Sequence, residues 1–434
     1  MRHHDNQRQV RVPALGERHA KTITGLIGNV QEWYDFALYG YMAPILSGLF
    51  FPGHSELVSL LAAYGVFAAG FVMRPLGGVL FGWVGDRIGR ARALAMSMLL
   101  ISLPTVLLGL LPGYATIGIA APILLTLIRL VQGLSVGGEF SSSVTYLVET
   151  APRAHRGTAG SWANIGSIIG MLLGAGLAAA TTTFLDSTTV QAWGWRLPFL
   201  FGGVLGIAAL YLRRNLHTSP HFQAHEEGRA DTAPLREAFT RDLRITLQAI
   251  AFTSAYGVMF YIPLVYLPTW VHDEAGMALD TAQQINTAGT ALMLPLIPLM
   301  AWISDRWIRR SHFIALAMFV MAIVAWPLYK LAADGGAFAY AATQFVFAVL
   351  VAVPLGVAPA LMVELFPAED RLTGYSLAYN LGLGIAGGTA PMIATWLIEI
   401  TGSALAPAAY LGVLALIAAL VLMSVHDRSR EALA

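Results

Sequence analysis

The segment GWVGDRIGRAR at residues 82–92 has an altered copy, AWISDRWIRRS, at residues 301–311, about half a chain length further on. Three charged positions match between the copies: Asp86 and Asp305, Arg87 and Arg306, and Arg90 and Arg309. A second pair of segments, ETAPRAHRGTAGS (149–161) and ELFPAEDRLTGYS (364–376), is separated by almost the same distance. Repeats of this period predict two similar halves with a substrate site between them.

Apolar stretches fill the sequence around these copies. Hydrophobic residues make up 56% of the 434 residues, charged residues only 12%, and the mean hydropathy is +0.64, which is too apolar for a water-soluble globule. The alternation of barrel strands is absent, so spanning helices of roughly 20 residues remain. The sequence therefore predicts an all-α membrane protein of 12 transmembrane helices in two pseudo-symmetric six-helix bundles. The predicted helices lie near 24–50, 57–84, 93–111, 117–146, 158–181, 195–212, 245–270, 281–303, 312–331, 337–362, 373–398 and 405–425.

The basic residues predict how the chain is oriented in the membrane. All but four of the 26 Lys and Arg lie in the tails or in alternate loops, the exceptions being Arg74, Arg129, Arg196 and Lys330. Since basic loops stay in the cytoplasm, both termini are predicted to be cytoplasmic, in a multi-pass protein of the bacterial inner membrane. The predicted parts are a tail at 1–22, an amino-terminal six-helix bundle at 23–213, a linker at 214–243, a carboxy-terminal six-helix bundle at 244–426 and a tail at 427–434.

Four ionisable residues fall deep inside the predicted helices. Glu32 and Asp35 lie midway along the first helix on one face, Arg74 lies in the second helix, and Arg129 lies in the fourth. A charge at such depth costs at least ~2.5–3.5 kcal/mol, so we expect these side chains to face a cavity and to pair. One interpretation is direct binding of substrate and proton; the other is an ion-pair network that only holds the first half together.

Charge counting within this cluster predicts symport. With both carboxylates ionised the cluster is neutral, and adding one proton leaves a net positive site that favours an anion. We expect Asp35 to carry the proton, with Glu32 as the second candidate and Arg129 as a modulator. Arg74 is the predicted partner of a substrate carboxylate, because a guanidinium offers two parallel donors.

Polar and aromatic residues are the remaining candidates for the substrate site. Aromatic walls suit a quaternary ammonium through cation–π contacts, whereas the alternative role of such residues is packing or a place in the membrane-interface belt. The candidates are Tyr34, Tyr39, Tyr256, Tyr261, Gln344, Tyr375, Tyr379 and Asn380.

Several segments resemble a known family. GWVGDRIGRAR and RLVQGLSVGGEF (129–140) resemble two signatures of the major facilitator superfamily. Within it, GNVQEWYDFALYGY (28–41), GVFAAGFVMRPLGG (65–78) and WGWRLPF (193–199) resemble the metabolite:proton symporter family, and GSWANIGSIIGMLLGAG (160–176) resembles its proline/betaine branch. The resemblance implies proton-coupled import of a small organic acid or of a zwitterionic osmolyte such as proline or betaine, by alternating access. After Ala434 there is no coiled-coil extension like that of some osmosensing members, which argues against an osmosensory role.

The repeated loop segment is the predicted gate. Gly82 permits close helix approach, Gly89 permits a sharp turn, and Asp86 can pair with arginines or cap a helix. The alternative is that the arginines only anchor the loops on the cytoplasmic side. The predicted gating residues are Gly82, Asp86, Arg87, Gly89, Arg90, Asp305, Arg306 and Arg309.

Other classes of function are less well supported. A drug/proton antiporter or a facilitative uniporter of the same fold stays open, although the fifth helix lacks the Gly-Pro-rich antiporter pattern. No phosphate-binding loop and no convergent catalytic group is apparent, so neither an ATPase nor an enzyme is predicted. The histidines at 217, 221 and 225 are interrupted by Pro220, and no metal, cofactor or nucleic-acid site is expected. We expect a monomer in the lipid bilayer, binding its substrate and a proton.

Overall fold

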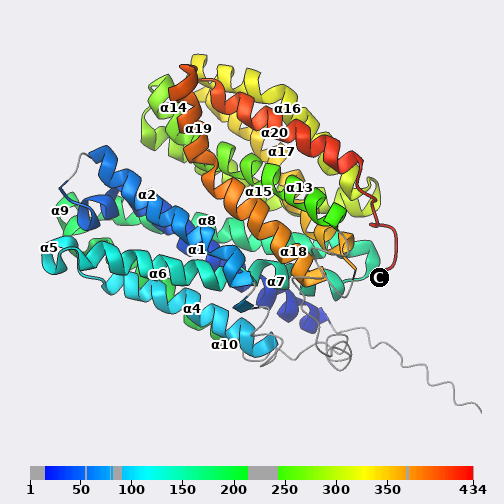
Figure 1. Cartoon of the computed structure of the whole chain (residues 1–434), viewed down its shortest axis with the longest axis horizontal. Helices are drawn as coiled ribbons and strands as arrows, with labels where there is room; N and C mark the ends of the chain where they lie inside the picture. Colours follow the sequence, from blue (N-terminus) through cyan, green and yellow to red (C-terminus); the bar gives the residue numbers. More distant parts are fainter. Residues whose placement is uncertain are drawn as a thin grey trace, which may run out of the picture.

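The computed structural model describes residues 15–53, 56–78, 80–81, 90–213, 243–367 and 371–433. In these ranges the chain is helical apart from short turns, and no β-strand occurs in them. The helices form two groups, coloured blue to green and green to red in Figure 1. The predicted linker at 214–243, except Leu243, and the predicted tail before Leu15 lie outside the described residues, so the predicted division into parts stays a prediction.

Long apolar helices account for the twelve predicted membrane crossings. Nine helices of the described residues are long and apolar enough to cross a membrane, and a pair bent by 47°, Ser187–Gly194 and Arg196–Leu212, provides a tenth. The other two crossings are α1 (Leu15–Phe50), a 36-residue helix, and α4 (Arg90–Leu110), whose apolar part is shorter. The chain is a multi-pass membrane protein.

The first group of helices contains two spans that are interrupted by short breaks. The span Ala120–Glu149 divides into α6 and α7 at Gly137 and Gly138, and the bent pair divides at Trp195. Besides α1 and α4, the group consists of α2 (Glu56–Val72), α5 (Tyr114–Ile117), α6 (Ala120–Val136), α7 (Glu139–Glu149), η1 (Arg153–His155), α8 (Arg156–Phe184), α9 (Ser187–Thr189), η2 (Val190–Gly194) and α10 (Arg196–Arg213).

The second group also has two interrupted spans, each broken by a turn of π-helix. Pro263 lies in the first of these turns and has no backbone N–H to donate, and the second has the glycine-rich sequence NLGLGIAG. The group consists of α13 (Leu243–Tyr261), η3 (Ile262–Tyr266), α14 (Leu267–Ala275), α15 (Leu279–Arg306), α16 (Arg310–Asp334), α17 (Gly336–Leu365), α18 (Arg371–Tyr379), η4 (Asn380–Gly387), α19 (Gly388–Thr401) and α20 (Ala406–Met423).

Glycines bring the helices that carry the deep charges into backbone contact. A Cβ atom at Gly133 of α6 would lie 2.0 Å from the backbone oxygen of Gly70 on α2. A Cβ atom at Gly170 of α8 would lie 2.3 Å from the backbone oxygen of Val30 on α1. Because no other residue fits at these two positions, the glycines fix how closely α2 meets α6 and α1 meets α8.

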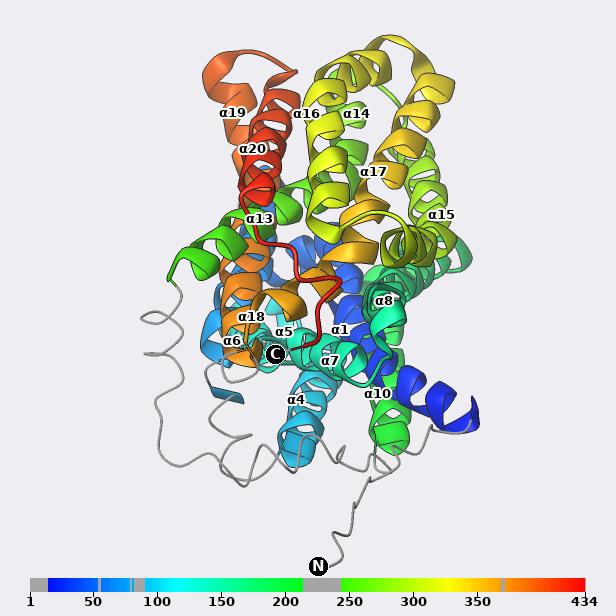
Figure 2. The same cartoon turned by 90° about the vertical axis from the view of Figure 1, so that its right-hand side faces the viewer.

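The two groups meet along α8 and α7. Helix α8 packs against α15 and α17, and α7 packs against α17 and α18. The end of the chain returns to the same region, where the backbone oxygen of Glu431 accepts a hydrogen bond from Arg156 at the start of α8 (3.1 Å). In Figure 2 the carboxy terminus accordingly lies beside α7.

Candidate functional site

Two buried ion pairs lie in the middle of the first group of helices. Glu32 and Asp35 of α1 face Arg74, at the end of the second span, and Arg129 of α6. The shortest N–O distances are 3.5 Å between Arg74 and Glu32 and 3.2 Å between Arg129 and Asp35. All four residues are 1% exposed. The predicted pairing of the deep charges is confirmed, and their roles stay predictions.

The Asp35 carboxylate is surrounded by hydrogen-bonding groups from two other helices. Its Oδ2 accepts from Nε2 of Gln132 (2.7 Å) and from Nη1 of Arg129 (3.2 Å). Its Oδ1 lies 2.6 Å from the hydroxyl of Thr105 on α4. Gln132 also orients the Arg129 guanidinium, since its Oε1 accepts a hydrogen bond from Nη1 of Arg129 (3.0 Å). Both oxygens of this buried acid therefore have partners, as is usual for a buried polar group.

The Glu32 carboxylate has far fewer partners. Among the described residues neither of its oxygens takes part in a hydrogen bond, and the same holds for Nε and Nη2 of Arg74. The guanidinium carbon of Arg74 instead lies over two aromatic rings, 4.6 Å from the centroid of Phe36 and 4.4 Å from that of Phe71. These contacts hold the cation while leaving donors unused.

The Glu32–Arg74 pair borders the second group of helices. Phe71 meets Tyr261 of α13 edge-on with ring centroids 5.9 Å apart, and Trp33 meets Phe260 at 5.3 Å. Within the described chain the hydroxyl of Tyr261 and the indole N–H of Trp33 are buried without a hydrogen-bond partner. Unsatisfied polar atoms from both halves therefore lie at this part of the boundary.

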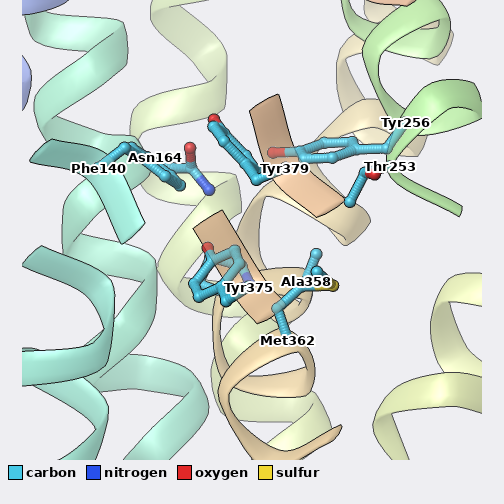
Figure 3. A pocket seen from close by; sticks show the side chains of 9 residues that line it. Phe140, Asn164, Thr253, Tyr256, Ala358, Met362, Tyr375 and Tyr379 are labelled. Atoms are coloured by element: carbon cyan, nitrogen blue, oxygen red, sulfur yellow. The ribbon is translucent and has the colours of Figure 1, made fainter. Parts of the chain in front are cut away.

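A narrow crevice, too tight in this structure to hold a ligand, lies at the boundary between the halves. It is lined by Phe140 and Asn164 from the first half and by Tyr256, Tyr375 and Tyr379 from the second, which face one another in Figure 3. Phe140 and Tyr379 are stacked with ring centroids 4.6 Å apart. The stacking closes the pocket between the halves.

The structure separates the predicted substrate residues into two sets. Tyr256, Tyr375 and Tyr379 line the pocket, Tyr261 borders the Arg74 pair, and Asn380 donates to the backbone oxygen of Gly137 across the boundary (2.5 Å).

The other three candidates lie inside one half each. Tyr34 donates to the backbone of Pro198 on α10 (2.5 Å), Tyr39 donates to Ala63 (3.1 Å) beneath Arg129, and Gln344 bonds Asn286 and Pro263. These three side chains therefore pack within a half and do not line the pocket.

A second set of charged contacts ties the halves together near the carboxy terminus; we name it the terminal latch. Asp305 at the end of α15 accepts from the backbone N–H groups of Gly157 and Thr158 in the first turn of α8 (2.8 Å each). A carboxylate at a helix N-terminus satisfies free N–H groups and the helix dipole. Across the same boundary Arg371 bonds Glu149 at 2.7 Å.

The terminal latch includes residues that the sequence analysis did not select. Asp305 pairs with Arg310 (2.9 Å), which also binds Glu364 through two nitrogens (2.7 and 3.1 Å), and Arg156 lies 3.8 Å from Glu364. Arg306 lies over the Trp302 ring, and Arg309 caps α16. The second pair of repeated segments contains Glu149, Arg156, Glu364 and Arg371, and this repeat was the available signal.

Part of the predicted gate cannot be placed. Gly82, Asp86, Arg87 and Gly89 lie outside the described residues, and of Arg90 only the backbone, at the start of α4, is described.

Two groups of membrane-spanning helices, with buried charges and a pocket at their boundary, define the class of secondary transporters. Residues 21–238 match the family model for sugar (and other) transporters, and residues 256–433 match the model for the Major Facilitator Superfamily. The proline/betaine transporter of Salmonella typhimurium is 37% identical over 426 residues, which cover 95% of this chain and 84% of that protein. The glycine betaine/proline/ectoine/pipecolic acid transporter OusA of Dickeya dadantii is 35% identical, with the same coverage. The chain belongs to the major facilitator superfamily and, within it, to the metabolite:proton symporter family.

Solved structures agree on the fold. The proton:xylose symporter XylE bound to 6-bromo-6-deoxy-D-glucose superposes with a TM-score of 0.77 at 18% identity, covering 96% of this chain and 98% of that one. The predicted fold class is therefore confirmed. Family membership likewise confirms the predicted class of function, a proton-coupled symporter of a small metabolite, and the protein is a transporter rather than an enzyme. The alternatives, a drug/proton antiporter or a uniporter, are not favoured.

Proposed function

We propose that the protein imports a small zwitterion of the proline or betaine type together with a proton, by alternating access. The relatives reported above are named as transporters of proline, betaine, ectoine and pipecolic acid, compounds that join a carboxylate to a cationic nitrogen. The observation that carries the proposal is the Glu32–Arg74 pair, a buried acid and base 3.5 Å apart with unused hydrogen-bonding atoms at the boundary between the halves.

The chemistry of this pair suits both ends of a zwitterion. In Arg74, Nε and Nη2 have no hydrogen-bond partner in the described chain, although Nη2 lies 3.5 Å from Glu32, and both can hold a substrate carboxylate. Glu32 supplies the opposite charge for the cationic nitrogen. The aromatic rings of Phe71 and Tyr261 stand beside the pair and can contact a quaternary or secondary ammonium through their faces. A dicarboxylate would place a second negative charge next to Glu32, and this repulsion favours a zwitterion over a larger organic acid.

Asp35 and Arg129 form the proton site in this proposal, with Glu32 as the second candidate for the proton. Asp35 is bound to Arg129 and also contacts two neutral groups, Thr105 and Gln132, which can adapt to either charge state of the acid. Protonating Asp35 removes the negative partner of Arg129 and leaves the cluster more positive. The substrate carboxylate then binds more readily, which couples the two ligands.

Opening and closing of the halves completes the transport cycle. We propose that the terminal latch, with the loop residues Gly82, Asp86, Arg87, Gly89 and Arg90, closes the cytoplasmic side, and that both termini face the cytoplasm of a bacterial inner-membrane monomer. Separation of Phe140 from Tyr379 would widen the pocket toward the substrate, where Tyr256, Tyr375 and Asn380 can contact it. Asp305 and Arg371 would release their partners when the cytoplasmic side opens.

Uptake into proteoliposomes tests the substrate class. We expect an inward proton gradient to drive accumulation of labelled proline or betaine, an uncoupler to abolish it, and unlabelled dicarboxylates to compete poorly. Accumulation of a dicarboxylate in preference to the zwitterions would overturn the substrate assignment. Lys330→Gln, which removes an exposed cation near the end of α16, is the control variant and should transport like the unmodified protein.

A further inference from the structure

We infer that Thr105 is a positioning residue for the coupled proton: its hydroxyl accepts a hydrogen bond from protonated Asp35 and donates one to ionised Asp35, and so sets the pH range of symport. The inference rests on the proposed function of Asp35 as the proton carrier. It assigns a role to a neutral side chain on α4 that has no part in the substrate site.

The hydrogen bonds around Thr105 leave room for one further proton between its Oγ1 and Oδ1 of Asp35. Its Oγ1 lies 2.6 Å from Oδ1 of Asp35 and 2.8 Å from the backbone oxygen of Ile101, yet the hydroxyl has a single hydrogen to donate. When Asp35 is protonated, both contacts become hydrogen bonds, since the acid donates to Thr105 and Thr105 donates to Ile101. When Asp35 is ionised, the hydroxyl turns its hydrogen to the carboxylate, and Ile101 keeps only its helical partner.

The other carboxylate oxygen cannot take the proton without losing a donor. Oδ2 of Asp35 already accepts from Gln132 and from Arg129. The second hydrogen on Nε2 of Gln132 points to Oγ1 of Thr105 (3.0 Å), and Oε1 of Gln132 is occupied by Arg129. Gln132 thus fixes the remaining hydrogen bonds and directs the mobile proton to the contact between Oδ1 and Oγ1.

Packing holds the Thr105 hydroxyl toward Asp35. Thr105 and Gln132 are fully buried, so water does not replace either contact. The methyl group of Thr105 lies against Gly202 of α10, where a Cβ atom would come within 2.7 Å of it. The glycine leaves room for this rotamer, which points the methyl toward α10 and the hydroxyl toward α1.

Few charged groups surround this contact. On α1 itself Glu32, Tyr34 and Tyr39 are the neighbouring titratable residues, while Arg129 of α6 and Arg74 of the second span face the acids from the other side. Glu139 of α7 is a further buried acid near Glu32, and it accepts a hydrogen bond from Ser97 of α4 (2.9 Å). The adjoining segments 97–110 of α4, 163–178 of α8 and 202–209 of α10 contain no charged residue. Thr105 is therefore the neutral group on which the choice between the two states of Asp35 depends.

The test compares Thr105→Val with Thr105→Ser in proteoliposomes. Valine has nearly the shape of threonine without the hydroxyl, and serine keeps the hydroxyl without the methyl group. A hydrogen bond to an ionised group is stronger than one to a neutral group, so the valine variant loses more stabilisation of ionised Asp35. We expect the pH of half-maximal zwitterion uptake to rise by about one unit in Thr105→Val and to stay unchanged in Thr105→Ser.

Two further measurements separate this role from a loss of folding. Substrate exchange at equal pH on both sides should persist in Thr105→Val, and infrared difference spectra of the purified protein should show the carboxyl band of Asp35 shifted to higher frequency. The band is assigned by its loss in Asp35→Asn. An unchanged pH profile and an unchanged band in Thr105→Val would overturn the inference. Absence of any pH-driven uptake in the unmodified protein would instead overturn the proposed function.

Discussion

The two ion pairs of α1 lie only three residues apart, yet they differ in how completely they are bonded. Asp35 has Arg129, Gln132 and Thr105 within hydrogen-bonding distance, whereas neither oxygen of Glu32 has such a partner in the described chain. Both guanidinium groups rest on the same ring, since the centroid of Phe36 is 4.6 Å from Arg74 and 4.8 Å from Arg129. Within the described residues Nε and Nη2 lack a hydrogen-bond partner in both arginines, so the two pairs differ in their carboxylates.

This difference indicates different tasks. A buried carboxylate whose two oxygens are hydrogen-bonded can stay in place through the whole cycle, changing only its protonation state. A buried charge without such bonds is destabilised until a ligand supplies the missing partners, because each unmet polar group costs about 1–3 kcal/mol. The Glu32–Arg74 pair, whose carboxylate has no hydrogen bond in the described chain, is therefore suited to binding the substrate, and the Asp35 carboxylate, whose two oxygens are bonded, is suited to holding the proton.

Removing the charge of Asp35 tests the hydrogen-bonded carboxylate and should have the largest effect. For a carrier that moves one proton with each substrate, a gradient of one pH unit supports about tenfold accumulation. In Asp35→Asn we expect no accumulation at all, while exchange of internal for external substrate remains measurable, because the Arg74 site is intact. The measurement is labelled proline or betaine inside proteoliposomes at steady state, with and without the gradient.

The control for this prediction is Glu399→Gln, which neutralises an exposed acid in α19. It should accumulate substrate normally. Accumulation in Asp35→Asn with the original pH dependence would exclude Asp35 from coupling and leave Glu32 as the candidate.

The twelve helices and the four deep charges were predictable from the sequence because both depend on the membrane. Hydropathy over 20 residues and the cost of an isolated charge in hydrocarbon are large signals that need no knowledge of packing. That the deep charges pair with one another followed from the same cost, whereas the structure shows which partners meet, Glu32 with Arg74 and Asp35 with Arg129.

The partners of the charges could not be predicted in this way. Thr105 is a single hydroxyl residue in an apolar stretch, and membrane helices commonly contain such residues, so the sequence gives it no special role. Only the packing of α4 on α1 brings it to Asp35. Tyr34 and Gln344 pack within one half each, which the sequence did not show, because the position of an aromatic or amide residue along a helix does not reveal which neighbour it will face. Arg310 and Glu149 were visible as loop charges, but their ion pairs with Glu364 and Arg371 join helices distant in sequence.

Replacing each arginine by lysine sharpens the comparison and should have an intermediate effect. Lysine keeps the charge but loses the planar pair of donors. At Arg74 we expect the KM for the zwitterion to rise roughly 10- to 100-fold, corresponding to the loss of about 1.5–3 kcal/mol of charge-assisted hydrogen bonding. At Arg129 we expect a displaced pH profile with a much smaller change in KM.

Initial uptake rates over a range of substrate concentration and pH measure both quantities for the two variants. The assignment of roles fails when Arg74→Lys leaves KM unchanged, or when Arg129→Lys raises KM as much as Arg74→Lys does.

The terminal latch supplies a third ion pair, against which the two deep pairs can be judged, and it should give the smallest effect. Glu149 is 32% exposed, so its contact with Arg371 is partly screened by solvent and contributes about 0.5–1 kcal/mol. Glu149→Gln should therefore shift the balance toward separated halves only about two- to fivefold.

The chain contains no cysteine, so a single Ala358→Cys probe in the pocket reports this shift through its rate of thiol labelling in detergent. Glu399→Gln in the same background serves as the control, and equal labelling rates in the two variants would mean that the Glu149–Arg371 contact does not hold the halves together. An increase far beyond fivefold would show instead that this partly exposed pair is as decisive for the closed state as the buried pairs of α1 are for binding.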